Sequence, residues 1–405
     1  MLEPQQEDIA WRIVLVSGFM ALIIFGIRLS FSVFFAEFVV AEGWSNEAAA
    51  GIFSVSMLVF AFGSTPAGIL LDRYGPRVIF TCGVVLLAVG LFLSSRVNTV
   101  GQLIVTYGII GGSGLAIVGL GPVAANIAAW VPPSARGRAI GVAFAGTGLG
   151  SLIFVPMSTW LIDTIGWRSA YVVLAAICLF ILAPVLIMVL RKPPGIEIRR
   201  DIADDSRALF RSPVFWLLML VSLMALGPLR ALTVHQVAYI QSNGIDRSVA
   251  ATYVGLAGFL TIGAFIMWGW VSDRFGRALA FTLGALSLAG AVGVLLVLPD
   301  AGDSRILIAY AMFYALGEGT RSSQTTALAS DVFQASGLGL VNGLVGAMFG
   351  LGAAFGPWIV GRLRDTTGDY TLGFITVLIM ISISIAGFVG IVWLQSASRK
   401  AQETD

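Results

Sequence analysis

Apolar residues in this chain form long runs that are separated by short polar breaks. A helix that crosses a bilayer needs about 20 mostly apolar residues, and the polar breaks divide the chain into about twelve runs near or above this length. The runs cover residues 11–40, 47–71, 77–94, 99–131, 137–162, 168–190, 213–241, 248–271, 277–298, 304–330, 336–363 and 370–395. We therefore predict an all-α integral membrane protein with twelve transmembrane helices.

The composition agrees with this pattern. Hydrophobic residues make up 58% of the 405 positions and charged residues only 11%, with a mean hydropathy of +0.92, whereas soluble domains are about 25% charged. The first apolar run has no small-residue cleavage site, which favours an uncleaved first helix over a signal peptide. Cys82 and Cys178 both lie in apolar runs, so we expect neither a disulfide framework nor a metal site. A net charge of +2 gives no reason to expect a nucleic-acid partner.

One polar motif occurs twice and divides the chain into halves. Gly68-x-x-x-Asp72-Arg73-x-Gly75-x-Arg77 follows the second run, and Gly269-x-x-x-Asp273-Arg274-x-Gly276-Arg277 follows the eighth, with the two aspartates 201 residues apart. A second pair of patterns repeats at nearly the same offset, Pro156…Asp163…Gly166 and Pro357…Asp365…Gly368. Self-similarity at a fixed offset indicates duplication. We predict two pseudo-symmetric six-helix bundles, residues 1–190 and 213–405, joined by a cytoplasmic linker at 191–212.

Basic residues predict the orientation. With the linker inside the cell, about fifteen Lys and Arg residues outside the helices fall on the cytoplasmic side and about six on the other. Positive charge is enriched in cytoplasmic loops. We therefore expect a multi-pass protein of the cell (inner) membrane with both termini in the cytoplasm.

The twelve runs and the doubled loop motif resemble the major facilitator superfamily. Three further patterns resemble its monocarboxylate-porter and oxalate/formate-antiporter branch: Gly166-Trp167-Arg168, His235-x-x-Ala-Tyr239, and Gly356-Pro357…Asp365-x-x-Gly368-Asp-Tyr370. The resemblance implies a monomeric secondary transporter without enzyme activity or cofactor. It also implies a gating role for the charged residues of the loop motif, which are Asp72, Arg73, Arg77, Asp273, Arg274 and Arg277. In the alternative, the positive charge of these loops only keeps them on the cytoplasmic side.

Three arginines, Arg28, Arg230 and Arg321, lie deep inside apolar runs. A charged side chain at the bilayer centre costs from about 3 to over 10 kcal/mol, so it normally faces a cavity and marks a substrate path. The resemblance implies that helices 1, 4, 7 and 10 line this cavity, and the arginines belong to helices 1, 7 and 10. Arg28 and Arg230 lie 202 residues apart and are repeat partners that can clamp an anion. In the alternative, either arginine extends to a membrane interface instead.

Two residues are candidates for proton coupling. Glu318 precedes Arg321 by three positions, so the two can form a purely structural ion pair. Alternatively, Glu318 carries a proton and exchanges Arg321 with the substrate. His235, the only histidine, has an unperturbed pKa suited to a proton relay, although a lone histidine on a helix is more often a packing residue.

Other polar and small residues have two interpretations each. Tyr107, Asn126 and Tyr314 can orient a polar substrate, or they can bridge neighbouring helices. Glycines line the fifth and eleventh runs, and small residues at this spacing allow close helix contacts. We predict that these glycine faces meet between the two halves.

We predict a secondary active transporter of small organic anions, above all monocarboxylates, that works by proton symport or anion exchange. The paired arginines leave an organophosphate/phosphate antiporter open. A drug/proton efflux pump would need more buried acidic residues, and a non-transporting sensor would carry an added soluble domain. The chain contains no Gly-x-x-x-x-Gly-Lys-Ser/Thr phosphate-binding motif, so ATP is not expected to drive transport.

Overall fold

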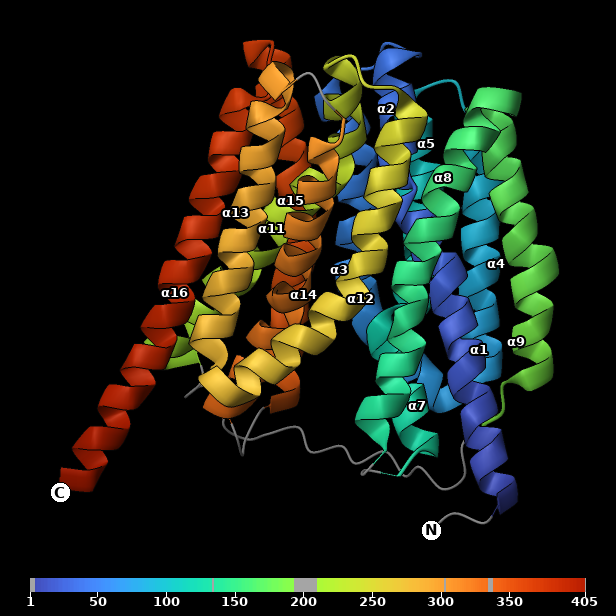
Figure 1. The fold of residues 1–405 in the computed structure, drawn as a ribbon. Coiled ribbons are helices and arrows are strands. Elements are labelled where there is room, and N and C mark those ends of the chain that lie inside the picture. Colours follow the sequence, from blue (N-terminus) through green and yellow to red (C-terminus); the bar gives the residue numbers. More distant parts are fainter. Residues whose placement is uncertain (1–3, 133–134, 193–209, 302–303, 334–337, 405) are drawn as a thin grey trace. The chain divides into compact units, whose positions relative to one another are not determined.

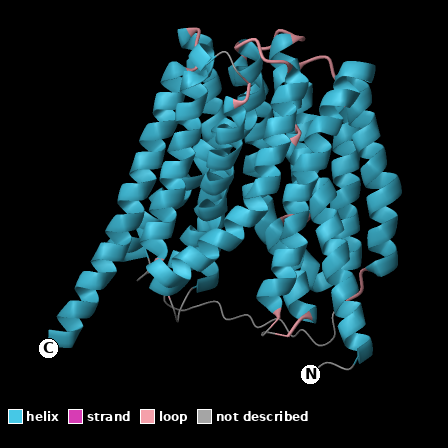
Figure 2. Ribbon diagram, viewed as in Figure 1, coloured by secondary structure: helices cyan, strands magenta, loops and turns pink. Residues whose placement is uncertain are grey.

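The computed structural model describes residues 4–132, 135–192, 210–301, 304–333 and 338–404 (Figure 1). Throughout these ranges the secondary structure is helical, without strands (Figure 2). The helices are α1 (Pro4–Leu29), α2 (Phe31–Val40), α3 (Asn46–Tyr74), α4 (Pro76–Ser94), α5 (Val100–Leu103), η1 (Ile104–Gly111), α6 (Gly112–Ile117), α7 (Leu120–Trp130), α8 (Arg136–Ala176), η2 (Ile177–Leu182), α9 (Ala183–Val189), α11 (Pro213–Ser242), α12 (Arg247–Phe275), α13 (Arg277–Ala301), α14 (Ile306–Val332), α15 (Leu338–Thr367) and α16 (Thr371–Thr404). The segments η1 and η2 are π-helical.

Helices long and apolar enough to cross a bilayer confirm the predicted fold class. Ten such stretches occur among the residues that the structure describes. The longest, Arg138–Val189, has 52 residues and is broken at Gly166, where φ is +78°. The 27-residue α14, which carries Glu318 and Arg321, is not one of the ten. The predicted number of twelve spans therefore stays a prediction.

Packing divides the chain into two compact units. The N-terminal unit comprises Met1–Arg199 and Val234–Phe259, and the C-terminal unit comprises Arg200–Thr233 and Leu260–Asp405. Residues 234–259, which we call the α11–α12 hairpin, contain the end of α11 and the beginning of α12. The predicted domain boundaries at 190 and 213 stay a prediction, and most of the predicted linker at 191–212 lies outside the described residues.

Glycine contacts bring helices close together inside each unit. In the N-terminal unit, a Cβ atom at Gly150 of α8 would lie 2.1 Å from the carbonyl oxygen of Leu22 in α1. In the C-terminal unit, a Cβ atom at Gly352 of α15 would lie 2.1 Å from the carbonyl oxygen of Leu223 in α11. Our prediction that the glycine faces meet between the two halves was wrong for Gly150 and Gly352. Because glycine has no side chain, two helices of one unit approach each other closely at each of these positions.

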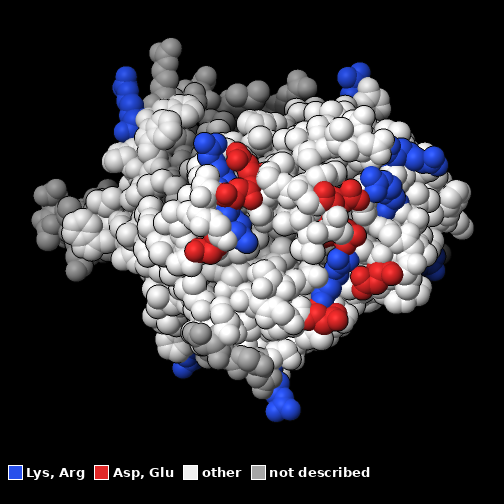
Figure 3. All heavy atoms as spheres, turned by 90° about the horizontal axis from the view of Figure 1, so that it is seen from above, with Lys and Arg blue, Asp and Glu red and all other residues white. Residues whose placement is uncertain are grey.

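Charged side chains lie next to one another on the face shown in Figure 3. Glu42, in the turn after α2, accepts hydrogen bonds from Trp167 Nε1 at 2.6 Å and from Arg168 Nη1 at 3.0 Å. These bonds, the Trp167 bond foremost, lower the pKa of the Glu42 carboxyl below its usual value. The left-handed Gly166 breaks α8 immediately before these two residues. The Gly166-Trp167-Arg168 pattern thus fastens α8 to the turn after α2.

The close approach of α11 and α15 predicts the effect of Gly352→Ala. The added methyl group must displace the backbone near Leu223, and overpacking of this kind costs about 1–3 kcal/mol. We expect a lower melting temperature for purified protein in detergent. Gly346→Ala is the control, because a Cβ atom at Gly346 meets no atom within 4 Å, and alanine raises helix propensity by up to about 1 kcal/mol. Equal melting temperatures for the two variants would contradict the close contact.

The contacts of Glu42 predict a pH-dependent contribution to stability. Because the pKa of Glu42 is lowered in the folded state, its contribution is present above the unfolded value of about 4.5 and is lost as pH falls through the lower folded value. Glu42→Gln should lower the melting temperature at pH 7, by about 1 kcal/mol in stability. The difference from wild type should vanish in the most acidic samples. Asp8→Asn, which alters an exposed carboxylate, serves as the control; a difference that persists unchanged at pH 3 would argue against the assignment.

Candidate functional site

Polar side chains inside the C-terminal unit gather on facing sides of α11, α14 and α16. Tyr314, Glu318 and Arg321 lie at i, i+4 and i+7 on α14, which places them on one face of the helix. Arg230 and Thr233 lie on α11 at a spacing of three, and Ser384 lies on α16. We call these six residues the C-terminal polar cluster. The cluster contains three of the residues that the sequence marks as binding residues and one that it marks as a proton carrier.

Two side-chain contacts join α11 to α14 in this cluster. Arg230 Nη2 donates to Glu318 Oε1 at 3.2 Å, and the two side chains are only 15% and 16% exposed. Thr233 Oγ1 and Tyr314 Oη share a hydrogen bond of 2.7 Å. Pro228 lies just before these residues and removes one backbone hydrogen bond from α11. The two contacts therefore fasten α11 to α14 at the last α11 residues that belong to the C-terminal unit.

Arg321 is completely buried but only partly bonded. Its side chain is 0% exposed, and Nη1 donates to Ser384 Oγ at 2.8 Å. Ser384 Oγ in turn donates to the carbonyl oxygen of Ile381 at 2.7 Å, which fixes the hydroxyl. The guanidinium carbon lies 5.5 Å from the centre of the Phe281 ring. Nε and Nη2 of Arg321 have no hydrogen-bond partner, and these two nitrogens form the side-on edge of the guanidinium.

The structure assigns Glu318 a different partner from the one expected. The spacing of three positions predicts a pair with Arg321, but Glu318 pairs with Arg230 across the helix interface. Arg321 is left without an ion-pair partner among the described residues. The cluster therefore holds two guanidinium groups and one carboxylate, an excess of one positive charge in a desolvated setting. An arrangement of this kind favours one further negative charge.

Arg28 of the N-terminal unit contacts a methionine sulfur and aromatic rings. It precedes the break between α1 and α2, well inside the candidate span Asp8–Val40, and is 9% exposed. Arg28 Nη2 contacts Met57 Sδ at 2.9 Å, and the guanidinium carbon lies 5.0 Å from the Phe60 ring centre. Arg28 is buried and the Arg230 side chain is 15% exposed, and the alternative in which either one reaches a membrane interface stays a prediction.

The polar residues predicted on helix 4 are buried in the N-terminal unit but lie in different settings. Tyr107 belongs to the π-helical η1, and its ring centre lies 5.2 Å from Phe31 and 6.1 Å from Tyr171. The Tyr171 hydroxyl is buried without a hydrogen-bond partner. Asn126 lies on α7, and its Nδ2 also lacks a partner. Substrate contact by Tyr107 or Asn126 stays a prediction.

The α11–α12 hairpin holds two further polar residues. His235 is buried, and its ring meets Phe35 edge-on at 4.6 Å between ring centres. Arg247, at the beginning of α12, donates to Asp163 Oδ1 at 3.2 Å and forms an ion pair with Glu37. Sequence reasoning placed Arg247 in a loop and did not identify these pairs. They fasten the hairpin to α2 and α8, and a proton role for His235 stays a prediction.

The doubled loop motif forms turns whose arginines hold distant helix ends. Gly75 and Gly276 adopt φ values of +81° and +93°, which only glycine adopts without strain. Arg77 Nε donates to the carbonyl oxygen of Leu190 at 2.8 Å, and Arg277 forms a two-point ion pair with Asp331 at the end of α14.

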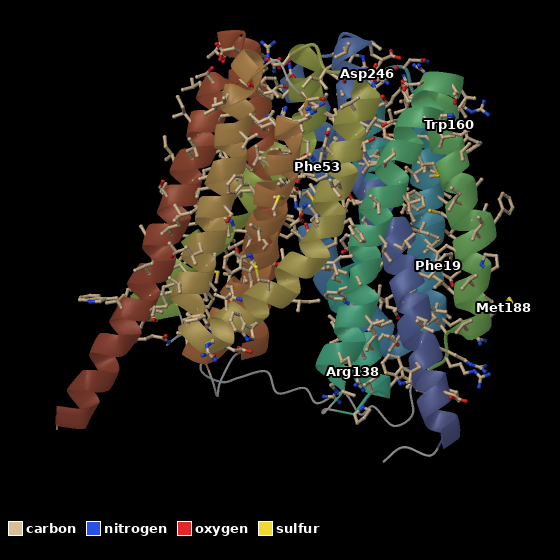
Figure 4. The ribbon with its side chains drawn as sticks, in the orientation of Figure 1. Phe19, Phe53, Arg138, Trp160, Met188 and Asp246 are labelled. Atoms are coloured by element: carbon tan, nitrogen blue, oxygen red, sulfur yellow. The ribbon has the colours of Figure 1, made fainter. Side chains whose placement is uncertain are left out.

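The remaining motif residues have aromatic or exposed surroundings. Arg73 lies over Tyr74 and Arg274 over Trp270, whereas Asp273 is exposed and the side chain of Asp72 is outside the described residues. Arg136 donates to the carbonyl oxygen of Val131, and Arg138 lies over Trp11. Arg138 and Asp246 mark opposite ends of the N-terminal unit, while Met188 projects outward from α9 (Figure 4). Gating by the motif stays a prediction.

Several residues of the site had no clear sequence signal. Ser384 and Thr233 are single hydroxyl residues in apolar runs, where serine and threonine also bond to their own helix. Phe281, Met57 and Phe60 are common core residues. Nothing in their spacing connects them to an arginine on another helix.

Comparison with known proteins agrees with this architecture. The chain is 28% identical to monocarboxylate transporter 13 of Rattus norvegicus over 374 residues, which cover 92% of this chain and 86% of the relative. It is 29% identical to monocarboxylate transporter 11 of Homo sapiens over 341 residues, covering 82% and 72%. It is 24% identical to a nitrite extrusion protein of Bacillus subtilis (strain 168) over 348 residues, covering 84% and 83%.

Two solved structures share the fold. A bacterial homologue of the human lysosomal transporter Spinster superposes with a TM-score of 0.70 at 15% identity, covering 97% of this chain and 98% of the other. The nucleoside transporter NupG superposes with a TM-score of 0.77 at 13% identity, covering 94% and 99%. The family model of the Major Facilitator Superfamily matches residues 14–313 and 236–404. The chain is therefore a membrane transporter and belongs to the Major Facilitator Superfamily.

Proposed function

We propose that this transporter carries small organic anions, above all monocarboxylates, across the cell membrane by alternating access. Its coupling is proton symport or exchange for another anion, it acts as a monomer, and both termini lie in the cytoplasm. The observation that carries this proposal is the buried guanidinium of Arg321, whose Nε and Nη2 have no partner.

The geometry of that edge matches a carboxylate. Nε–H and Nη2–H point in parallel, so they can donate two hydrogen bonds to the two oxygens of one carboxylate. Ser384 bonds to Nη1, on the other side of the guanidinium, and keeps the free edge in a fixed orientation. A pre-oriented donor pair of this kind loses little entropy when it binds an anion.

The charge of the cluster favours a monoanion. Arg230 and Arg321 carry two positive charges and Glu318 one negative charge, so one bound carboxylate neutralises the cluster. A phosphate ester carries about −1.5 to −2 charges at pH 7 and would leave excess negative charge, which disfavours the organophosphate alternative. A cationic drug would meet only Glu318, and Arg230 already pairs with it.

The names of the relatives point the same way. Two are named for monocarboxylates and one for nitrite, which is also a monoanion. We infer that this chain shares the preference for a single negative charge. The predicted clamp formed by Arg28 and Arg230 remains a prediction, and Arg321 is the residue on which the proposal rests.

A thermal-shift panel on detergent-purified protein tests this function. The ligands are lactate, pyruvate, oxalate, formate, glycerol phosphate, phosphate and several cationic dyes. A ligand that binds only the folded state raises the melting temperature, so we expect stabilisation by the monocarboxylates. Arg321→Gln should weaken their binding by more than about 100-fold, since it removes two charge-assisted hydrogen bonds that each contribute about 1.5–3 kcal/mol. Arg321→Lys should also bind more weakly, because it keeps the charge but loses the two-point edge.

Two controls separate lost binding from lost folding. Without ligand, Arg321→Gln should melt no lower than wild type, because it removes an uncompensated buried charge. Arg12→Gln changes an exposed arginine and should respond to the ligands as wild type does. If monocarboxylates stabilise Arg321→Gln as much as wild type, the anion does not bind at Arg321. A response of the wild type to cationic dyes alone would overturn the anion proposal.

A further inference from the structure

We infer that a groove between the end of α4 and the beginning of η1 binds one phospholipid whose headgroup is negatively charged. Such a lipid site is separate from the residues of the proposed function. Three features indicate it: a cavity of about 480 Å³ at this place, an apolar wall on helices that span the bilayer, and an arginine at the outer end of that wall.

The length of α4 places the groove at a membrane surface. The 19 residues of α4 span about 29 Å, at a rise of about 1.5 Å per residue, which is close to the hydrocarbon thickness of a bilayer. Arg77 lies in the first turn of α4 and Arg96 follows its last turn, so the two arginines lie at opposite membrane surfaces. Helix α5 follows Arg96 and lies at the end of the N-terminal unit opposite to Arg138 (Figures 1 and 4). The groove therefore opens at the depth of the lipid headgroups.

Close packing of α4 and η1 forms the deep end of the groove. A Cβ atom at Gly90 would lie 2.6 Å from the backbone nitrogen of Gly111, so the two helices meet backbone to backbone there. One turn nearer the surface, Ser94 Oγ donates to Thr106 Oγ1 at 2.9 Å and joins the same two helices. The groove is thus a fixed feature of the packing of α4 against η1.

The wall of the groove is apolar and faces outward. Leu93 and Val105 line the groove, with exposed fractions of 37% and 50%. Phe92, next to Leu93, is 45% exposed. All three residues belong to stretches that can cross the bilayer, where an exposed apolar side chain meets acyl chains. An acyl chain can pack along this wall, whereas a soluble phosphate compound has no apolar part to place there.

Arg96 determines the charge that the lipid must carry. Among the described residues that line the groove, Arg96 alone is charged. Its side chain is exposed, and the guanidinium carbon lies 5.5 Å from the centre of the Phe92 ring, which holds the cation beside the apolar wall. A guanidinium group binds a phosphate through paired hydrogen bonds. Because these lining residues include no carboxylate, the ammonium group of a zwitterionic lipid finds no counter-charge among them, and a net negative headgroup is favoured.

Hydrogen bonds order the polar rim of the groove. Gln102 donates from its backbone nitrogen to Thr99 Oγ1 at 3.3 Å, and its Oε1 accepts from the backbone nitrogen of Asn98 at 2.9 Å. Arg168 Nη2 donates to the carbonyl oxygen of Val97 at 3.3 Å. The turn between α4 and α5 is therefore ordered before a lipid binds, which lowers the entropic cost of binding. The Gln102 amide nitrogen carries two further N–H donors at the rim, where they suit the hydroxyl groups of a glycerol headgroup.

Native mass spectrometry of the full chain in detergent tests this site. The probes are dioleoyl phosphatidylglycerol and dioleoyl phosphatidylcholine, which share acyl chains but differ in net charge, and glycerol phosphate, which has no acyl chain. We expect wild type to bind one phosphatidylglycerol more tightly than phosphatidylcholine. Arg96→Gln should weaken phosphatidylglycerol binding about fivefold, the contribution of one basic residue at an anionic lipid surface. Arg362→Gln alters another exposed arginine beside an aromatic ring and should bind as wild type does.

A second variant fills the groove and leaves its charge unchanged. A Cβ atom at Gly101, which lines the groove, meets no atom within 4 Å, so Gly101→Leu fits without displacing the protein. It should weaken phosphatidylglycerol binding although Arg96 is present, and it keeps the test decisive if Arg96→Gln fails to fold. Gly141→Leu is the matched control, because Gly141 is an exposed glycine of α8 with the same open space around its Cβ position.

Three outcomes would overturn the lipid site. Equal phosphatidylglycerol binding by wild type, Arg96→Gln and Gly101→Leu would show that the lipid binds elsewhere. Equal affinity of wild type for phosphatidylglycerol and phosphatidylcholine would contradict the requirement for a negative headgroup. Glycerol phosphate that binds as tightly as phosphatidylglycerol, and loses its binding in Arg96→Gln, would assign the groove to a soluble phosphate compound instead.

Discussion

A guanidinium group inside a membrane protein needs partners, because burial removes the water that would otherwise solvate its charge. Each buried arginine of this chain meets that requirement differently. Arg230 has the carboxylate of Glu318, Arg247 has two carboxylates, and Arg28 has a thioether and aromatic rings among its contacts. Arg321 has one serine hydroxyl and an aromatic ring. Among the described residues, Arg321 of the C-terminal polar cluster thus has no carboxylate partner.

Helix packing determines where these charges lie. Close glycine contacts hold α1 against α8 and α11 against α15, at positions related by the internal repeat. They fix the backbone of the helices that carry Arg28 and Arg230, so the polar side chains extend from rigid elements. The hydrogen bond from Trp268 to the carbonyl oxygen of Leu316 fastens α12 to α14 in the same way. Rigid support of this kind holds the Nε and Nη2 donors of Arg321 in a fixed orientation.

Sequence reasoning predicted the fold class and the family because hydropathy and repeated turns are local signals. The positions of Arg28, Arg230 and Arg321 in apolar runs also predict that burying them costs free energy. The ion-pair partner of Glu318, in contrast, could not be predicted from the sequence. Spacing along α14 favours Arg321, whereas the actual partner comes from α11, and only tertiary packing decides between them. The same limit applies to Ser384, to the ion pairs of Arg247, and to glycines whose helix partners lie in the same unit.

The path of α11 and α12 has a consequence for how the two halves of the gene product depend on each other. Helix α11 begins in the C-terminal unit and α12 ends in it, but residues 234–259 between them pack as part of the N-terminal unit. A fragment that ends in the linker would therefore lack the hairpin whose His235 meets the ring of Phe35 and whose Arg247 pairs with Glu37.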